Sequence, residues 1–91
     1  MPHLVSCHVP DNADLDRRMQ GIGGVGWYMS VDEVLIRMDR GEEFIVNYAG
    51  LPRVRVIPGR HPITLRRFIT TEGDGFPPNN LLRLPRCPGR Y

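Results

Sequence analysis

The sequence contains no lysine, so all 12 of its basic residues are arginines. A guanidinium group forms paired hydrogen bonds to phosphate and carboxylate groups that an ammonium group cannot form. A GC-rich coding bias produces the same residue usage, so the absence of lysine does not by itself indicate a function.

Long apolar runs and a recognisable leader are also missing. No apolar run approaches the roughly 18 residues that a membrane-spanning helix requires, and residues 1–3 do not resemble the start of a signal peptide. We therefore expect a soluble, cytoplasmic protein that has no membrane partner.

The composition is that of a folded chain. Leu, Ile, Val and Phe make up about 27% of the 91 residues, above the roughly 20% below which charged chains are usually disordered. Glycine and proline make up about 21%, short of the roughly 25–30% typical of low-complexity segments. We expect a single domain over residues 1–91, because the chain is too short for two.

The formal net charge of +2 conceals an uneven distribution of charge. Residues 1–50 hold four arginines against eight acidic residues, whereas residues 51–91 hold eight arginines against two acidic residues. The excess in the second half indicates either an electropositive surface for an anionic partner, or two halves that neutralise each other when the chain folds.

Residues 31–40 have the pattern of an amphipathic helix. Ser30 and Glu33 form a capping box, in which each side chain accepts a hydrogen bond from a backbone N–H that the helix leaves unpaired. Gly41 can adopt the left-handed conformation that ends a helix. The apolar residues recur at intervals of three and four, as they do on one helical face: Val31, Val34, Leu35 and Met38.

Five further segments are rich in β-forming residues and are separated by turn signals: 4–9, 18–22, 43–48, 53–56 and 63–70. Pro58-Gly59 is expected to end the fourth strand, and a bulge is expected at Arg66-Arg67, where the alternation breaks. Strands joined by short loops pair antiparallel. The sequence therefore predicts an α+β fold with a small antiparallel sheet of four or five strands and one helix packed on one face.

Three stretches, the first preceded by a strand that ends near Cys7 and a polar loop, carry a resemblance that spans nearly the whole chain. They are residues 19–24, residues 26–42 and residues 68–87, the last ending in Asn80-Leu81-Leu82-Arg83-Leu84-Pro85-Arg86-Cys87. Together they resemble a family of small bacterial proteins known only as a domain of unknown function, which has an NLLxLPxC tail. Thr70 stands where the family has arginine, and Gly21 where it usually has histidine. The resemblance implies a compact α+β domain and transfers no activity.

The strongest candidate site is a group of arginines near the middle of the chain. The alternation over residues 53–56 places two valines on one face of a strand and Arg53 and Arg55 on the other. If this strand pairs with the next one, Arg66 and Arg67 join them on the outer face. Such a cluster binds phosphate groups or a small anion. The alternative without a binding function is an exposed polar face whose arginines pair with nearby glutamates.

Cys7 and Cys87 are the two cysteines of the chain. A disulfide between them would stabilise the fold by roughly 4–5 kcal/mol in the loop-entropy model, but a cytoplasmic compartment keeps thiols reduced. We therefore expect buried free thiols. The alternatives are a disulfide, and metal ligation with His3 or His8, which no metal-ligand spacing supports.

The glycines and the tryptophan in the first half have structural interpretations. Residues 21–26 satisfy the pattern G-x-G-x-x-G, but three residues separate them from the helix cap, so flexible turn glycines explain the pattern better than dinucleotide binding. Trp27 is expected to anchor the core, and base stacking by its indole is the alternative.

No catalytic constellation and no cofactor motif is recognisable. Cys7 and His8 are adjacent on a predicted strand, so their side chains point to opposite faces and cannot form a dyad. The sequence therefore predicts a protein that is not an enzyme and needs neither a cofactor nor a metal.

The function that these observations favour is a non-enzymatic binding module that presents an arginine-rich sheet face to an anionic partner, with nucleic acid as the first candidate. The predicted site residues are Arg53, Arg55, Arg66 and Arg67. One alternative is a protein–protein adaptor or homodimer formed through an exposed edge strand. The other is a small-molecule, nucleotide-like binder, which requires a deep pocket near Trp27 that the glycine loop and arginines line.

Overall fold

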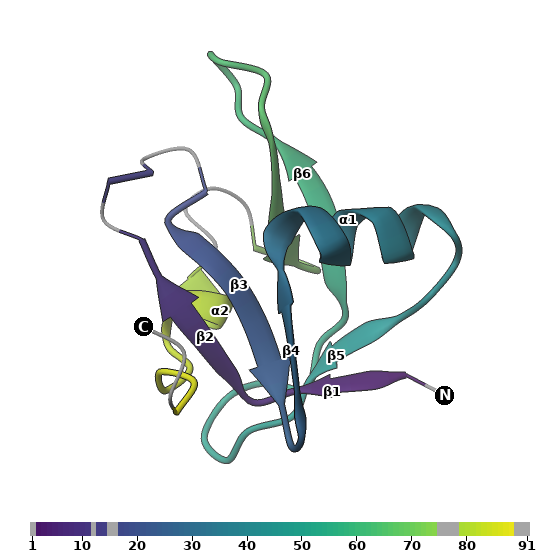
Figure 1. The fold of residues 1–91 in the computed structure, drawn as a ribbon, viewed down its shortest axis with the longest axis vertical. Helices are drawn as coiled ribbons and strands as arrows, with labels where there is room; N and C mark the ends of the chain where they lie inside the picture. Colours follow the sequence, from purple (N-terminus) through teal and green to yellow (C-terminus); the bar gives the residue numbers. More distant parts are fainter. Residues whose placement is uncertain (1, 12, 15–16, 75–78, 89–91) are drawn as a thin grey trace.

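The computed structural model describes residues 2–11, 13–14, 17–74 and 79–88. Its strands are β1 (His3–Val5), β2 (Cys7–Pro10), β3 (Met19–Gly24), β4 (Trp27–Ser30), β5 (Phe44–Val46), β6 (Val56–Arg60) and β7 (Arg67–Thr71). Its helices are α1 (Val31–Asp39) and α2 (Asn79–Leu82). Figure 1 shows their arrangement.

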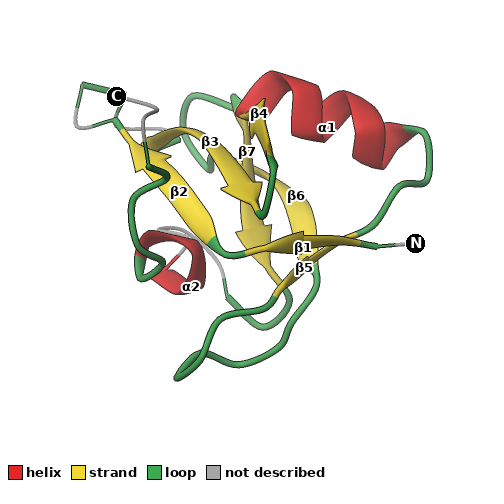
Figure 2. Ribbon diagram, turned by 60° about the horizontal axis from the view of Figure 1, so that its bottom comes forward, coloured by secondary structure: helices red, strands yellow, loops and turns green. Residues whose placement is uncertain are grey.

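The strands form three small sheets (Figures 1 and 2). Two are antiparallel, with the orders β2-β3-β4 and β6-β7, and the third is the parallel pair β1-β5. Only Ser6 separates β1 from β2, so one extended run pairs first with β5 and then with β3. A bridge between Ile45 and Arg55 links β5 to the segment that leads into β6. The sheets are therefore connected side by side.

The α+β class is confirmed, whereas the prediction of one antiparallel sheet of four or five strands is wrong. The parallel pair joins segments that are far apart in the sequence, and such pairing leaves no local signal. Pro58-Gly59 does not end a strand but lies inside β6. The prediction of a bulge at Arg66-Arg67 is also wrong, because the β6–β7 register is regular and the alternation breaks at the preceding turn.

The helix prediction is confirmed almost to the residue. Ser30 caps α1, and its Oγ accepts a hydrogen bond from the backbone N–H of Glu33 at 3.2 Å. Gly41 has a φ of +90°, the left-handed conformation expected after the last turn. The predicted apolar face packs against β3, β4, β6 and β7, so this one helix covers parts of two sheets.

One apolar core joins the three sheets to both helices. Its buried members are Val5, Met19, Ile22, Val31, Val34, Leu35, Phe44, Val46, Val56, Ile69, Leu81 and Leu84. A second, smaller cluster contains Cys7, Val9 and Cys87, at the end where α2 packs against β2 and β7 (Figure 2). The core leaves the turn between β6 and β7 uncovered, and this turn stands beyond α1 at the top of Figure 1.

Candidate anion-binding site

The register of the β6–β7 hairpin separates the four predicted arginines into two groups. Val56 lies opposite Thr71 at one end of the hairpin, and Arg60 lies opposite Arg67 at the other. Arg55 precedes the first end. At about 3.3 Å per residue, the five residues from there to Arg60 span roughly 16 Å. The predicted cluster therefore does not gather on one patch of the sheet.

Arg53 and Arg55 form the first group, near the start of β6. The predicted alternation holds here, because both arginines are exposed while Val56 is buried and Val54 packs against the core. Arg55 pairs with Glu43 at 3.5 Å. Arg53 forms no ion pair with any residue that the structure describes.

Arg66 and Arg67 form the second group, at the far end of the hairpin, and each pairs with a carboxylate through two hydrogen bonds. The two Nη atoms of Arg66 donate to Asp14 at 3.0 and 3.1 Å. Those of Arg67 donate to Asp39 at 3.0 and 2.9 Å. The hydrogen bonds from Arg67 lower the pKa of the Asp39 carboxyl group. Both arginines thus already hold oxyanions of the same chain.

Arg60 belongs to this site, although the sequence pattern did not indicate it. It lies directly opposite Arg67, and like charges in that position repel each other. Its Nη1 donates to the backbone oxygen of Leu65 at 2.9 Å, and it pairs with no carboxylate of the described residues. Arg60 and Arg67 line a shallow hollow of about 400 Å³ together with Asp39. The expected strand end at Pro58-Gly59 concealed this pairing.

The turn that carries these arginines is held by its own hydrogen bonds. The ring Nδ1 of His61 accepts from the backbone N–H groups of Ile63 and Thr64 at 3.2 and 3.3 Å. The backbone N–H of His61 donates to the oxygen of Arg66 at 2.9 Å, and that of Leu65 donates to the oxygen of His61 at 3.0 Å. The turn therefore fixes the direction in which the end of the hairpin presents its side chains.

A fourth arginine reaches the same end of the hairpin from the loop before β3. The Nε of Arg17 donates to the backbone oxygen of Arg67 at 2.9 Å, and its Nη1 lies 2.9 Å from a carboxylate oxygen of Asp32. Arg17 is thus tied to α1 and to β7. We name Arg17, Arg60, Arg66 and Arg67 the hairpin arginines.

Trp27 is half-buried and contacts the core, as expected. Its ring centroid lies 5.9 Å from that of Phe44 and 5.7 Å from that of His3. The indole also lines an open hollow of about 370 Å³ with His3 and Asn47 among its walls. No arginine lines this hollow, so the small-molecule alternative lacks the charged pocket that it requires within the described residues.

The glycines of residues 21–26 lie in a hairpin rather than in a phosphate-binding loop. They form the end of β3 and the turn into β4, and Gly26 has a φ of +78°. Dinucleotide binding needs a turn from a strand into a helix, and this turn leads into a strand. The structural interpretation of these glycines is therefore the better one.

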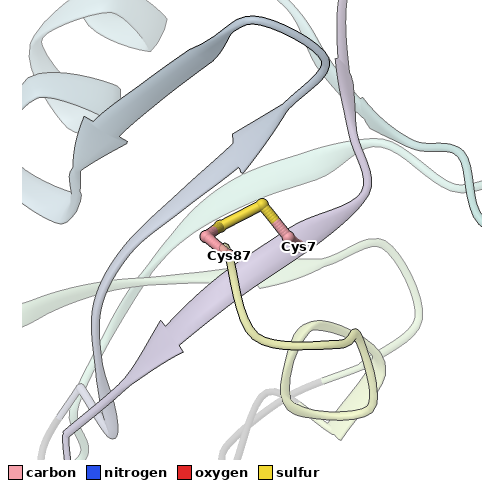
Figure 3. The surroundings of a disulfide bond; sticks show 2 residues. All are labelled: Cys7 and Cys87. Carbon is pink, nitrogen blue, oxygen red and sulfur yellow. A yellow bond between two sulfur atoms is a disulfide. The ribbon is translucent and has the colours of Figure 1, made fainter. Parts of the chain in front are cut away.

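The expectation of free thiols is wrong, because Cys7 and Cys87 form a disulfide (Figure 3). A parallel bridge between His8 and Arg86 places the segment after α2 beside β2, so that the two Cα atoms lie 4.8 Å apart. This pairing joins residues from opposite ends of the chain. Among the described residues, no group of three or more His, Cys, Asp or Glu is arranged to hold a metal ion.

Comparison with known proteins gives no further guide. No protein-family model, no curated protein and no solved structure matches the chain. The resemblance to the bacterial family with the NLLxLPxC tail therefore stays a prediction. No helix in the described ranges is long and apolar enough to cross a membrane.

Proposed function

We propose that the protein is a non-enzymatic binding module whose hairpin arginines hold the phosphate groups of an anionic partner, with nucleic acid as the first candidate. One observation carries this proposal: Arg60 and Arg67 lie opposite each other beside one hollow, and Arg66 is next in the chain. The paired hydrogen bonds from Arg67 to Asp39 have the geometry in which a guanidinium holds a phosphate.

Exchange of a carboxylate for a phosphate is energetically accessible at this site. The Arg67–Asp39 pair is exposed, and exposed ion pairs contribute little to stability because water and salt screen them. A phosphate would also give Arg60 the anionic partner that it lacks among the described residues. Binding to a nucleic acid gains further free energy from the release of counterions. These terms favour a partner with several phosphates over a single small anion.

The test is a fluorescence anisotropy titration of a labelled DNA duplex and a labelled RNA strand at several salt concentrations. The double variant Arg60→Gln/Arg66→Gln removes two charges from the hairpin end. Arg53→Gln/Arg83→Gln removes two charges from exposed arginines elsewhere, so it is the matched control.

The proposal predicts that wild-type affinity falls as salt rises, and that the hairpin variant binds roughly tenfold more weakly with a smaller salt slope. The control should bind as the wild type does. The proposal is contradicted if the wild type binds neither the DNA nor the RNA. It is also contradicted if the control variant loses as much affinity as Arg60→Gln/Arg66→Gln does.

A protein partner is the second candidate, and the tip of the hairpin favours it. Ile63 and Leu65 are 83% and 59% exposed and both lie in the turn between β6 and β7, so a protein partner at this turn would bury apolar surface. For a homodimer, light scattering across a concentration series would show twice the monomer mass. The change Ile63→Ser/Leu65→Ser should return it to the monomer mass. A monomer mass at every concentration excludes the homodimer.

A further inference from the structure

The Cys7–Cys87 disulfide borders an open hollow on the surface. Both cysteines line this hollow of about 290 Å³, together with Trp27 and Tyr28 from β4. Cys7 is 7% exposed and Cys87 is 2% exposed, so the first of the two is the more accessible. A small thiol can therefore approach the sulfur atoms from solvent without crossing the main core.

The disulfide fastens the last described segment to an edge of the fold. We call residues 85–88 the tail. The backbone N–H of His8 donates to the oxygen of Pro85 at 2.9 Å, and the N–H of Cys87 donates to the oxygen of His8 at 2.9 Å. The opposite edge of β2 pairs with β3. The tail thus covers an outer strand edge, and the disulfide is the covalent link between the two.

The contact between β2 and the tail also encloses an unsatisfied polar group. His8 is 5% exposed, and its Nδ1 is buried without a hydrogen-bond partner in the described part of the chain. An unpaired buried polar atom disfavours the closed arrangement, since water would satisfy it after opening. Separation of the tail from β2 would therefore let water reach this Nδ1, at the cost of the hydrogen bonds between the His8 side chain and the backbone of Leu84 and Pro85. The main core contains no equivalent unsatisfied atom among its described side chains.

We propose that Cys7–Cys87 is a redox modification site, at which a dithiol reduces the disulfide in the folded protein and thereby releases the tail from β2. One thiolate of the dithiol attacks the Sγ of Cys7, the disulfide breaks, and Cys87 leaves as a thiolate. The second thiolate of the dithiol then attacks the dithiol's other sulfur, which is bonded to Cys7 in the mixed disulfide. Cys7 leaves as a thiolate.

The electrons and protons balance in this exchange. The dithiol becomes a cyclic disulfide and is oxidised by two electrons, which reduce the two cysteines. Its two protons end on the two protein thiols. Without the covalent bond, the tail keeps noncovalent contacts only, among them its two backbone hydrogen bonds to His8, the contacts of the His8 side chain with the backbone of Leu84 and Pro85, and the anchor at Leu84, which is buried in the main core.

The first test asks whether the folded protein reacts. The protein is incubated with increasing dithiothreitol, quenched by alkylation and followed by mass spectrometry. Attack on the folded state predicts a rate proportional to dithiol concentration and unchanged by low concentrations of urea. A rate that reaches a plateau, or that rises with urea in step with global unfolding, overturns the proposal.

The second test asks what reduction releases. Hydrogen exchange at the N–H of His8 and of Cys87 should accelerate at least tenfold after reduction. The N–H of Val46, which donates to the oxygen of Val54 inside the fold, should keep its protection. The variant Cys7→Ser/Cys87→Ser should show the same pattern without a reductant. If this variant does not fold, the comparison is made with the reduced wild-type protein alone. Tail amides that stay protected, or loss of protection at Val46, contradict the release.

Discussion

The disulfide end of the molecule and the end of the β6–β7 hairpin are built from different interactions. At the disulfide end, Cys7, Val9 and Cys87 are buried and a covalent bond joins distant parts of the chain. At the hairpin end, Arg66 and Arg67 form ion pairs that solvent reaches, and Ile63 is almost fully exposed. One end is closed by packing, and the other is held by contacts that can change partner.

This difference indicates where recognition and where stability reside. Buried packing and a disulfide contribute several kcal/mol to the free energy of unfolding. Exposed ion pairs contribute little and exchange readily with charged ligands. Changes at the disulfide end should therefore alter stability, and changes at the hairpin end should alter binding. The following predictions test this division, from the largest expected effect to the smallest.

Loss of the disulfide should have the largest effect on stability. The sequence separation of 80 residues corresponds to about 4–5 kcal/mol in the loop-entropy model. Urea unfolding of the oxidised and the reduced protein measures the difference directly. Equal midpoints for the two forms would show that the disulfide does not stabilise this end.

Two glycines at the two ends allow a matched comparison. A Cβ at Gly23 would lie 2.7 Å from the backbone oxygen of Trp27 and 3.1 Å from the Sγ of Cys7. A Cβ at Gly59 would lie 2.7 Å from the Cζ of the buried Phe68 side chain, and no backbone atom is among its three nearest neighbours. We expect Gly23→Ala to destabilise by about 1–3 kcal/mol, and Gly59→Ala by less. Thermal unfolding shows which variant is destabilised more. A larger loss of stability in Gly59→Ala would contradict the assignment of stability to the disulfide end.

The pH dependence of stability should report on the disulfide end through His8. Burial lowers the pKa of His8 below its ordinary value of 6.5. Below that pH the unfolded chain binds a proton there before the folded chain does, so the free energy of unfolding decreases as the pH falls from about 6.5 through the folded pKa. His8→Gln should flatten this part of the curve in urea titrations at several pH values. If His8→Gln and the wild type show the same dependence of the free energy of unfolding on pH, groups other than His8 cause it.

A substitution at the hairpin end should change binding and leave stability nearly unaltered. Asp39→Asn removes the carboxylate that occupies Arg67. We expect a melting temperature close to that of the wild type and an affinity for nucleic acid a few times higher, because Arg67 no longer has to exchange partners. Calorimetry and anisotropy measure the two quantities. Weaker binding by this variant would show that Arg67 needs Asp39 to hold its position.

The features that the sequence predicted well are those coded by neighbouring residues. Ser30, Glu33 and Gly41 define the ends of α1 through local contacts, and the structure has this helix within one residue of the prediction. The alternation at Arg53 and Arg55 is also local, and both side chains are exposed as expected.

The features that the sequence did not predict depend on the pairing of distant segments. The β1–β5 pair and the disulfide join parts of the chain that have no local reason to meet. Pro58 was expected to end a strand, but a proline is tolerated on an edge strand where its missing N–H faces no partner. This continuation of β6 places Arg60 opposite Arg67, which only the register reveals.

The most direct test of the central claim is an NMR titration that follows the Nε–Hε signals of the arginines while an oligonucleotide is added. The account predicts that the signals of the hairpin arginines shift together and saturate, and that those of Arg53 and Arg83 stay in place. Shifts centred on Arg53 and Arg55, or no shift at any arginine, would contradict it.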